Sequence, residues 1–367
     1  MSTKVITVIG ARPQFIKAAM VSRAIAALNA SGDGTRIEER IVHTGQHYDP
    51  AMSDVFFQAL KIPSPAYHLG IGSGGHGAQT GRMLEALEPV LEKEKPDVVL
   101  VYGDTNSTLA GALCAAKLHI PVAHVEAGLR SFNRRMPEEI NRVMTDHLSS
   151  LLFAPTEAAV RNLKAEGIRE GVIRTGDVMY DAVLFFREKV GQLAAGVLER
   201  FGVKPGNYAF ATVHRAENTD DPERWAEIIQ GLTAVARSGL PVVWPVHPRT
   251  RERLDGFDVP GLHLLDPLPY FETQALLMHA RVALTDSGGL QKEAAFHKVP
   301  CVTLRDETEW VELIEHGVNQ SAGANARQIV TLALAARWPS AEFPREMYGD
   351  GGTSQIIVSR LRSYVPC

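Results

Sequence analysis

The sequence predicts an α/β protein built from two Rossmann-like, doubly wound domains. Three observations carry this prediction: a length of 367 residues, an alternation of short β-branched runs with longer amphipathic segments, and a restart of that alternation after about residue 206. At roughly 150 residues per domain, the length fits two domains. Strands and helices that alternate in this way form a parallel sheet covered by helices.

In the first half, short apolar runs predict the strands. They are Val5–Ile9, Ile41–Val42, Val98–Val101, Val122–Val125, Leu151–Phe153 and Val172–Ile173. Apolar residues at helical spacing from Phe15 to Leu28 and from Met83 to Leu91 predict two of the connecting helices, and Pro96 ends the second.

The second half repeats the pattern after a long helical segment around Tyr180–Phe201. Its strands are predicted at Tyr208–Val213, Val242–Trp244, Leu262–Leu265, Val282–Thr285 and Cys301–Leu304. We therefore place an N-terminal domain at residues 1–177, a C-terminal domain at 178–350, and at 351–367 a C-terminal helix that packs back on the N-terminal domain. Ligands of such sheets bind at the carboxyl ends of the strands. The residues that follow each strand are thus the candidate site residues.

Composition and charge narrow the function classes. Hydrophobic residues make up 45% and charged residues 22%, as in an ordinary soluble globular protein. The net charge of −4 provides no positive field that would attract nucleic acid. Cys114, Cys301 and Cys367 lack metal-binding or redox spacing. No run reaches the ~18 apolar residues of a membrane span, and the first residues do not resemble a signal peptide. We expect a cytoplasmic protein.

The first strand is followed by two cations. Pro13 is placed to open a helix, so Arg12 and Lys17 lie at and just inside a helix N-terminus, where anions are favoured. The alternative is a plain turn with solvated cations.

Three acids follow strands or open a helix in the same half. Asp104 follows the strand at Val98, Glu126 follows the next strand, and Glu138 lies in the first turn of a helix. Alone, each has an ordinary explanation: a helix cap, a partnered buried acid, or an acid favoured by the helix dipole. Together they are predicted to converge on one wall of a cleft.

The second half supplies a predicted diphosphate cradle. Ser287 can cap a helix, and Gly288 and Gly289 expose backbone N–H groups at its start. Glu293, one turn further on, lies within reach of a ribose diol. His214 and His247 end the first two strands of this half. The alternative is an ordinary capped helix.

Other signals fail. The run Gly70–Gly75 matches the dinucleotide-binding pattern, but Pro63 and Pro65 disfavour a central strand before it. The histidines lack tight ligand spacing, so neither NAD nor a metal is expected as cofactor.

Taken together, these motifs resemble the non-hydrolysing UDP-N-acetylglucosamine 2-epimerases. The shared marks are Gly10-Ala-Arg12-Pro13…Lys17, Gly103-Asp104-Thr105, His124-Val125-Glu126-Ala-Gly-Leu-Arg130, Pro137-Glu138-Glu139-Ile-Asn-Arg142, His214-Arg215-Ala-Glu-Asn218, Pro245-Val246-His247 and Asp286-Ser287-Gly288-Gly289…Glu293. The resemblance implies a glycosyltransferase-B-like (GT-B) architecture with the sugar nucleotide between the domains, and usually a homodimer. It also implies a reaction that inverts the sugar at C2 by elimination of UDP, formation of an acetamidoglycal and re-addition of UDP.

This chemistry divides the candidate residues into two groups. Departing UDP needs cations and amides, which suits Arg12, Lys17, His214, His247 and the segment Ser287–Gly289. The sugar side needs carboxylates as base, acid or oxocarbenium stabiliser, which suits Asp104, Glu126 and Glu138. Under the same resemblance, Glu293 binds the ribose, and Leu268, in the segment Asp266–Tyr270, lies near uracil.

Alternatives for the substrate and the class remain open. The basic loop Ser131–Met136 resembles the corresponding loop of a subgroup that acts on UDP-2,3-diacetamido-2,3-dideoxyglucuronic acid. If this chain has that substrate, Arg134 or Arg135 would bind the sugar carboxylate. A GT-B glycosyltransferase would share the fold and the UDP cradle, and a sensor of UDP-sugars would bind without catalysis.

Overall fold

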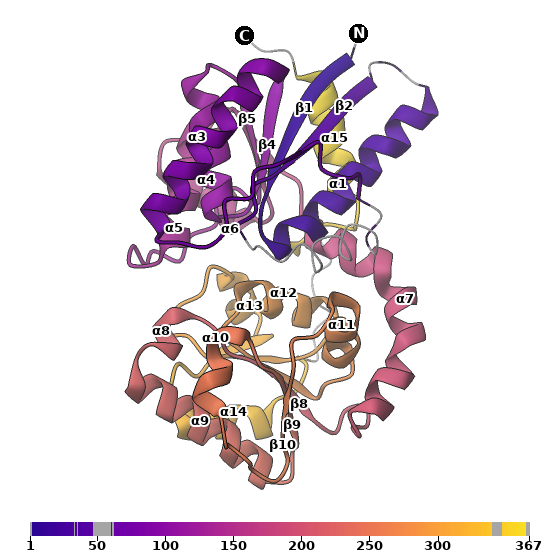
Figure 1. Ribbon diagram of the computed structural model, residues 1–367. Coiled ribbons are helices and arrows are strands. Elements are labelled where there is room, and N and C mark those ends of the chain that lie inside the picture. Colours follow the sequence, from indigo (N-terminus) through magenta and orange to yellow (C-terminus); the bar gives the residue numbers. More distant parts are fainter. Residues whose placement is uncertain are drawn as a thin grey trace. The chain divides into compact units, whose positions relative to one another are not determined.

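The computed structural model describes residues 2–32, 34, 36–46, 60, 62–339 and 347–364, which form two compact units (Figure 1). Unit 1 lies within residues 1–184 and 344–367, and unit 2 within residues 185–343. In the part of the chain that is described, no helix is both long and apolar enough to cross a membrane.

Unit 1 is a parallel sheet with helices on both faces (Figure 1). Its strands, in spatial order, are β3 (Tyr67–His68), β2 (Arg36–His43), β1 (Ser2–Ile9), β4 (Val98–Tyr102), β5 (Val122–Val125), β6 (Leu151–Ala154) and β7 (Val172–Arg174). Its helices are α1 (Arg12–Ser31), α3 (His76–Glu94), α4 (Asn106–Lys117), α5 (Pro137–Leu148), α6 (Glu157–Ala165) and α15 (Thr353–Ser363).

The centre of this sheet is apolar because its strands are covered on both faces. Every residue of β4 and β5 is buried. Their carboxyl ends lie beside that of β1, since β4 pairs with both β1 and β5. The loops that carry the candidate residues of the first half therefore leave the sheet at one edge.

Unit 2 repeats the arrangement. Its strands, in spatial order, are β10 (Leu262–Leu265), β9 (Val242–Pro245), β8 (Ala209–Thr212), β11 (Val282–Thr285), β12 (Cys301–Thr303) and β13 (Asn319–Ser321). Its helices are α8 (Ala216–Thr219), α9 (Pro222–Arg237), α10 (Pro248–Arg251), the 3-10 helix η1 (Glu252–Leu254), α11 (Tyr270–Met278), α12 (Gly288–Phe296), α13 (Val311–Glu315) and α14 (Ala326–Ala335). Two Rossmann-like parallel units confirm the predicted GT-B-like fold class.

The chain passes from unit 1 to unit 2 within α7 (Val178–Arg200). The predicted first boundary, between residues 177 and 178, lies at the start of this helix, whereas the units divide after Leu184. The chain then returns, and α15 packs against α1 in unit 1. The N-cap of α15 is Gly352, which has no side chain to cap it, and the carboxylate of Asp181 accepts hydrogen bonds from its first amides instead.

Candidate active site

A buried ion pair lies where β1, β4 and β5 end. The Lys17 ammonium, from the second turn of α1, contacts the Glu126 carboxylate at the end of β5. Their side chains are only 10% and 5% exposed. Lys17 was predicted to contact the diphosphate and Glu126 the sugar, and in unit 1 the two side chains contact each other.

Glu126 has an unusual backbone. Its φ is +73°, in the left-handed region that non-glycine residues rarely adopt. Its N–H donates to the Phe153 carbonyl of β6. Such strain persists where the surroundings over-determine it, and it concentrates at functional sites. The left-handed backbone thus marks Glu126 as a candidate functional residue.

Asp104 is held by α5. Its carboxylate accepts hydrogen bonds from the Arg142 guanidinium, at 3.2 Å from Nε and 2.5 Å from Nη2, and its carbonyl accepts from the Asn141 amide at 3.0 Å. The carboxylate stays partly exposed, while Arg142 is buried. A half-buried carboxyl group paired with a guanidinium in this way can meet a bound molecule.

Glu138 and its neighbour Glu139 differ in role. Glu138 lies half-buried in the first turn of α5. Glu139 is buried, and its carboxylate accepts from the backbone N–H groups of Ser131 and Phe132, each at 2.9 Å. Glu139 thus holds the loop that precedes α5, and Glu138 is the acid that remains partly exposed. Arg12, the first residue of α1, is also half-buried.

In unit 2, a fully buried carboxylate organises the loop after β8. Asp286 Oδ2 accepts from the backbone N–H groups of His214 at 3.0 Å and Arg215 at 2.9 Å, and from the Asn218 amide at 3.2 Å. The His214 ring stacks on the His247 ring, with centroids 5.6 Å apart. Sequence reasoning missed the role of Asp286, although its place between a buried strand and the predicted cradle could have indicated it.

The predicted cradle lies at the start of α12, which is a capped helix N-terminus. Ser287 is the N-cap, and its hydroxyl accepts from the Leu290 N–H at 3.5 Å. Gly289 is exposed, whereas Gly288 is buried against Glu309. Glu293 is buried one turn further on, and burial together with its carboxylate raises the pKa of Tyr270. Leu268 lies half-buried in the loop between β10 and α11.

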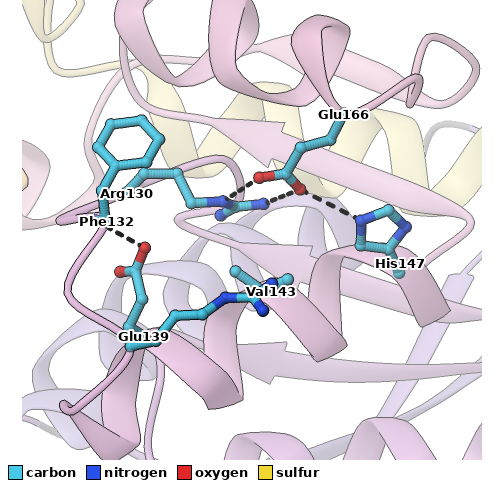
Figure 2. A pocket seen from close by; sticks show the side chains of 7 residues that line it. Arg130, Phe132, Glu139, Val143, His147 and Glu166 are labelled. Atoms are coloured by element: carbon cyan, nitrogen blue, oxygen red, sulfur yellow. Dashed lines mark hydrogen bonds and ion pairs between the residues drawn. The ribbon is translucent and has the colours of Figure 1, made fainter.

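The basic loop before α5 borders a pocket of about 340 Å³ in unit 1 (Figure 2). Its lining comprises Arg130, Phe132, Arg134, Glu139, Val143, His147 and Glu166. The Arg130 guanidinium pairs with Glu166 through two 2.7 Å hydrogen bonds. Arg134 lines the pocket, whereas Arg135 is not part of the lining. Among the described residues, no three His, Cys, Asp or Glu side chains gather as metal ligands.

Comparison with known proteins identifies close relatives. A family model described as UDP-N-acetylglucosamine 2-epimerase matches residues 29–362. A UDP-2,3-diacetamido-2,3-dideoxy-D-glucuronate 2-epimerase of Pseudomonas aeruginosa is 49% identical, over 98% of this chain and 99% of the relative. A UDP-N-acetylglucosamine 2-epimerase of Methanocaldococcus jannaschii is 46% identical over the same shares. A solved structure of UDP-GlcNAc 2-epimerase from M. jannaschii, in complex with UDP-GlcNAc and UDP, superposes with a TM-score of 0.89 at 43% identity, over 98% of this chain and 99% of that chain.

Proposed function

Because this chain belongs to the UDP-N-acetylglucosamine 2-epimerase family, we propose that it interconverts UDP-GlcNAc and UDP-ManNAc without hydrolysing them. The observation that carries the proposal is the pair of acids at neighbouring strand ends, Asp104 after β4 and Glu126 after β5, with Glu138 on the helix that holds Asp104. A binding protein would not need three such acids.

The reaction begins at the anomeric centre. The proton at C2 is not adjacent to a carbonyl, so its removal requires that the C1–O bond break as well. The electrons of the C1–O bond leave with UDP, and those of the C2–H bond form the C1=C2 double bond of the acetamidoglycal. Protonation of C2 on the other face and attack of UDP on C1 give the epimer. Asp104, Glu126 and Glu138 serve as base, acid and oxocarbenium stabiliser.

UDP must be held while it is detached from the sugar. The backbone N–H groups at Ser287–Gly289 and the ring of His214 stabilise the diphosphate, with Arg12 as a further cation and His247 stacked on His214. Glu293 takes the ribose hydroxyls, and Leu268 contacts the uracil. These roles need neither NAD nor a metal, so activity should survive exhaustive dialysis against a chelator.

Deuterium exchange tests the proposal. The protein is incubated with UDP-GlcNAc in deuterated water, with no acceptor present. An epimerase incorporates deuterium at C2 and produces UDP-ManNAc. A GT-B glycosyltransferase or a UDP-sugar sensor would leave C2 unlabelled, and that result would reject the proposal.

A second substrate has one specific observation in its favour. The P. aeruginosa relative at 49% identity is named for a UDP-diacetamido-glucuronate. A guanidinium pairs with a carboxylate in a bidentate manner, so Arg134 or Arg135 could read the C6 carboxylate of such a sugar. If so, Arg134→Gln or Arg135→Gln raises KM for the uronate and leaves KM for UDP-GlcNAc unchanged. Turnover of UDP-GlcNAc in clear preference to the uronate excludes this alternative.

The assembly and location are also part of the proposal. We expect a homodimer in the cytoplasm, as the sequence analysis predicted. The mass of the protein in solution, measured by light scattering after size exclusion, tests the first expectation.

A further inference from the structure

His124 lies in a buried polar network next to the candidate carboxylates. It belongs to β5, and its side chain is fully buried. Ring atom Nδ1 lies 2.7 Å from Asp146 Oδ1, and Nε2 lies 2.7 Å from the carbonyl oxygen of Gly103. The ring therefore bridges α5 and the loop that follows β4.

The partners of His124 fix its protonation. A carbonyl oxygen can only accept, so Nε2 must carry a proton. The other oxygen of Asp146 accepts from Arg130 at 2.7 Å and from the Gly128 N–H at 3.0 Å, as expected of a carboxylate. Burial raises the pKa of Asp146. Hydrogen bonds and charges from His124 and Arg130 lower this pKa by more, so it lies below its ordinary value. Asp146, itself held by Arg130 and Gly128, thus fixes the ring in the orientation that turns Nε2 toward Gly103.

The second contact of His124 controls a turn beside two candidate acids. Gly103 has a φ of +63°, its N–H donates to the Val125 carbonyl at 2.9 Å, and its own carbonyl accepts from His124. A Cβ at Gly103 would lie 3.3 Å from Glu126 Oε2 and from Lys17 Nζ. Gly103 thus lies beside the Lys17–Glu126 pair, and the carbonyl that His124 holds leads directly into Asp104.

We propose that His124 is a positioning residue, held between Asp146 and Gly103 with Nε2 as donor to the Gly103 carbonyl, that fixes the geometry of Asp104 relative to Glu126. Its effect on turnover rests on the proposed function, whereas its protonation does not. The charged groups around it are Asp146 on α5 and Arg130 in the loop after β5. Arg130 in turn pairs with Glu166, and Glu166 Oε2 lies 3.2 Å from Nε2 of His147 (Figure 2).

The protonation is tested in the wild-type protein. The protein is labelled with ¹⁵N-histidine, and its ring nitrogens are observed by NMR at about pH 7 and about pH 8. The signals missing from His124→Gln assign the residue. A proton attached to Nε2 of His124 is expected at both values, because the Gly103 carbonyl can only accept. An Nε2 without a proton at about pH 7 overturns the proposal, whether or not the protein epimerises anything.

Two variants separate the two contacts. The amide of Asn reaches the position of Nδ1 and keeps the contact with Asp146, whereas the amide of Gln reaches the position of Nε2 and keeps the donor to Gly103. If His124 positions the turn, His124→Asn lowers kcat about 100-fold with KM unchanged, and His124→Gln retains most of kcat. Glu157→Gln, exposed on α6 and outside this network, serves as the control with wild-type kcat.

The remaining outcomes are decisive too. Equal kcat in wild type, His124→Asn and His124→Gln rejects the positioning role. The positioning role is also rejected if His124→Asn and His124→Gln show the same decrease in kcat and the same decrease in melting temperature. Such a result would mean that His124 contributes to stability alone. Absence of epimerisation by the wild type refutes the proposed function, and the NMR result still decides the protonation.

Discussion

The Lys17 ammonium and the Glu126 carboxylate form an ion pair that is almost completely buried in unit 1. One partner comes from the helix that follows the first strand, and the other ends a strand two places away in the sheet. A cation assigned to the diphosphate thus compensates an acid assigned to the sugar. The two proposed functions of the site are electrostatically coupled.

Replacing Lys17 by Met should damage both stability and turnover. Removal of one partner of a buried ion pair costs about 3–5 kcal/mol of unfolding free energy. Lys17→Arg keeps the charge and should lose less stability. Denaturant unfolding measures the effect, and a Lys17→Met variant as stable as wild type would show that the pair contributes nothing.

Changing Asp104, Glu126 or Glu138 to its amide should lower epimerisation by about 10²–10⁴-fold for each variant, because a neutral amide can neither exchange the proton at C2 nor stabilise positive charge on the sugar. Deuterium incorporation at C2 gives the rate. Glu157→Gln is the control, because its side chain is 60% exposed and lies on α6. Full activity in all three variants would refute the assignment of these carboxylates.

Asp286→Asn should weaken UDP binding about 10-fold. An amide in place of the carboxylate presents an NH₂ group to at least one of the N–H donors of His214, Arg215 and Asn218, which costs on the order of 1–3 kcal/mol. The loop that carries His214 then loses its fixed position. Titration calorimetry with UDP measures the affinity, with the exposed Asp255→Asn as control. Equal affinities in the two variants contradict this role.

Gly288→Ala should destabilise unit 2, and Gly289→Ala should not. A Cβ at Gly288 would lie 2.1 Å from Glu309 Oε1, and Glu309 is buried and paired with Arg305 at 3.0 Å. At Gly289 the nearest atom, Ser287 Oγ, is 3.9 Å away. We expect a cost of about 1–3 kcal/mol for the first variant alone. Thermal unfolding without ligand distinguishes them, and identical melting temperatures would contradict the prediction.

Glu94 should make unit 1 sensitive to acid. Hydrogen bonds from Lys4 and then Tyr67 lower the pKa of Glu94 from 4.5 to about 2. A lowered acid pKa stabilises the fold above about pH 4.5, and this contribution disappears as the pH falls toward 2. Glu94→Gln should therefore be less stable than wild type at pH 7, and the difference should shrink at low pH. Glu92→Gln, exposed on the same helix, should show no such difference.

The central strands of both described sheets could be predicted from the sequence, as could the edge strands β7 and β10, whereas the edge strands β3 and β13 could not. The apolar runs at Val98–Val101 and Val282–Thr285 match β4 and β11, because strands buried on both faces admit few polar residues. The edge strands β3 and β13 were missed, since each is short and contains polar residues such as His68 and Gln320. The family resemblance drawn from the motifs is confirmed by the match over residues 29–362.

The candidate site was only partly accessible to sequence reasoning. Asp104 and Glu126 could be predicted as site residues because each follows a strand, and the carboxyl ends of parallel strands lie at one edge of the sheet. The pairing of Lys17 with Glu126, and the acceptance of two backbone N–H groups by Asp286, depend on side-chain directions and loop conformations that residue types do not specify. The roles of all these residues stay predictions.

The capping of α15 by Asp181 has a consequence for biosynthesis. Unit 1 is discontinuous in the chain, because α15 is translated after the whole of unit 2 and then packs against α1 (Figure 1). During synthesis on the ribosome, α15 is therefore absent while the roughly 160 residues of unit 2 are made. Over that time, the surface of α1 that later contacts α15 stays uncovered, as does the carboxylate of Asp181. Unit 1, whose synthesis begins first, is thus the last unit to be completed. A nascent chain stalled within unit 2 would expose this surface of α1 to chaperones.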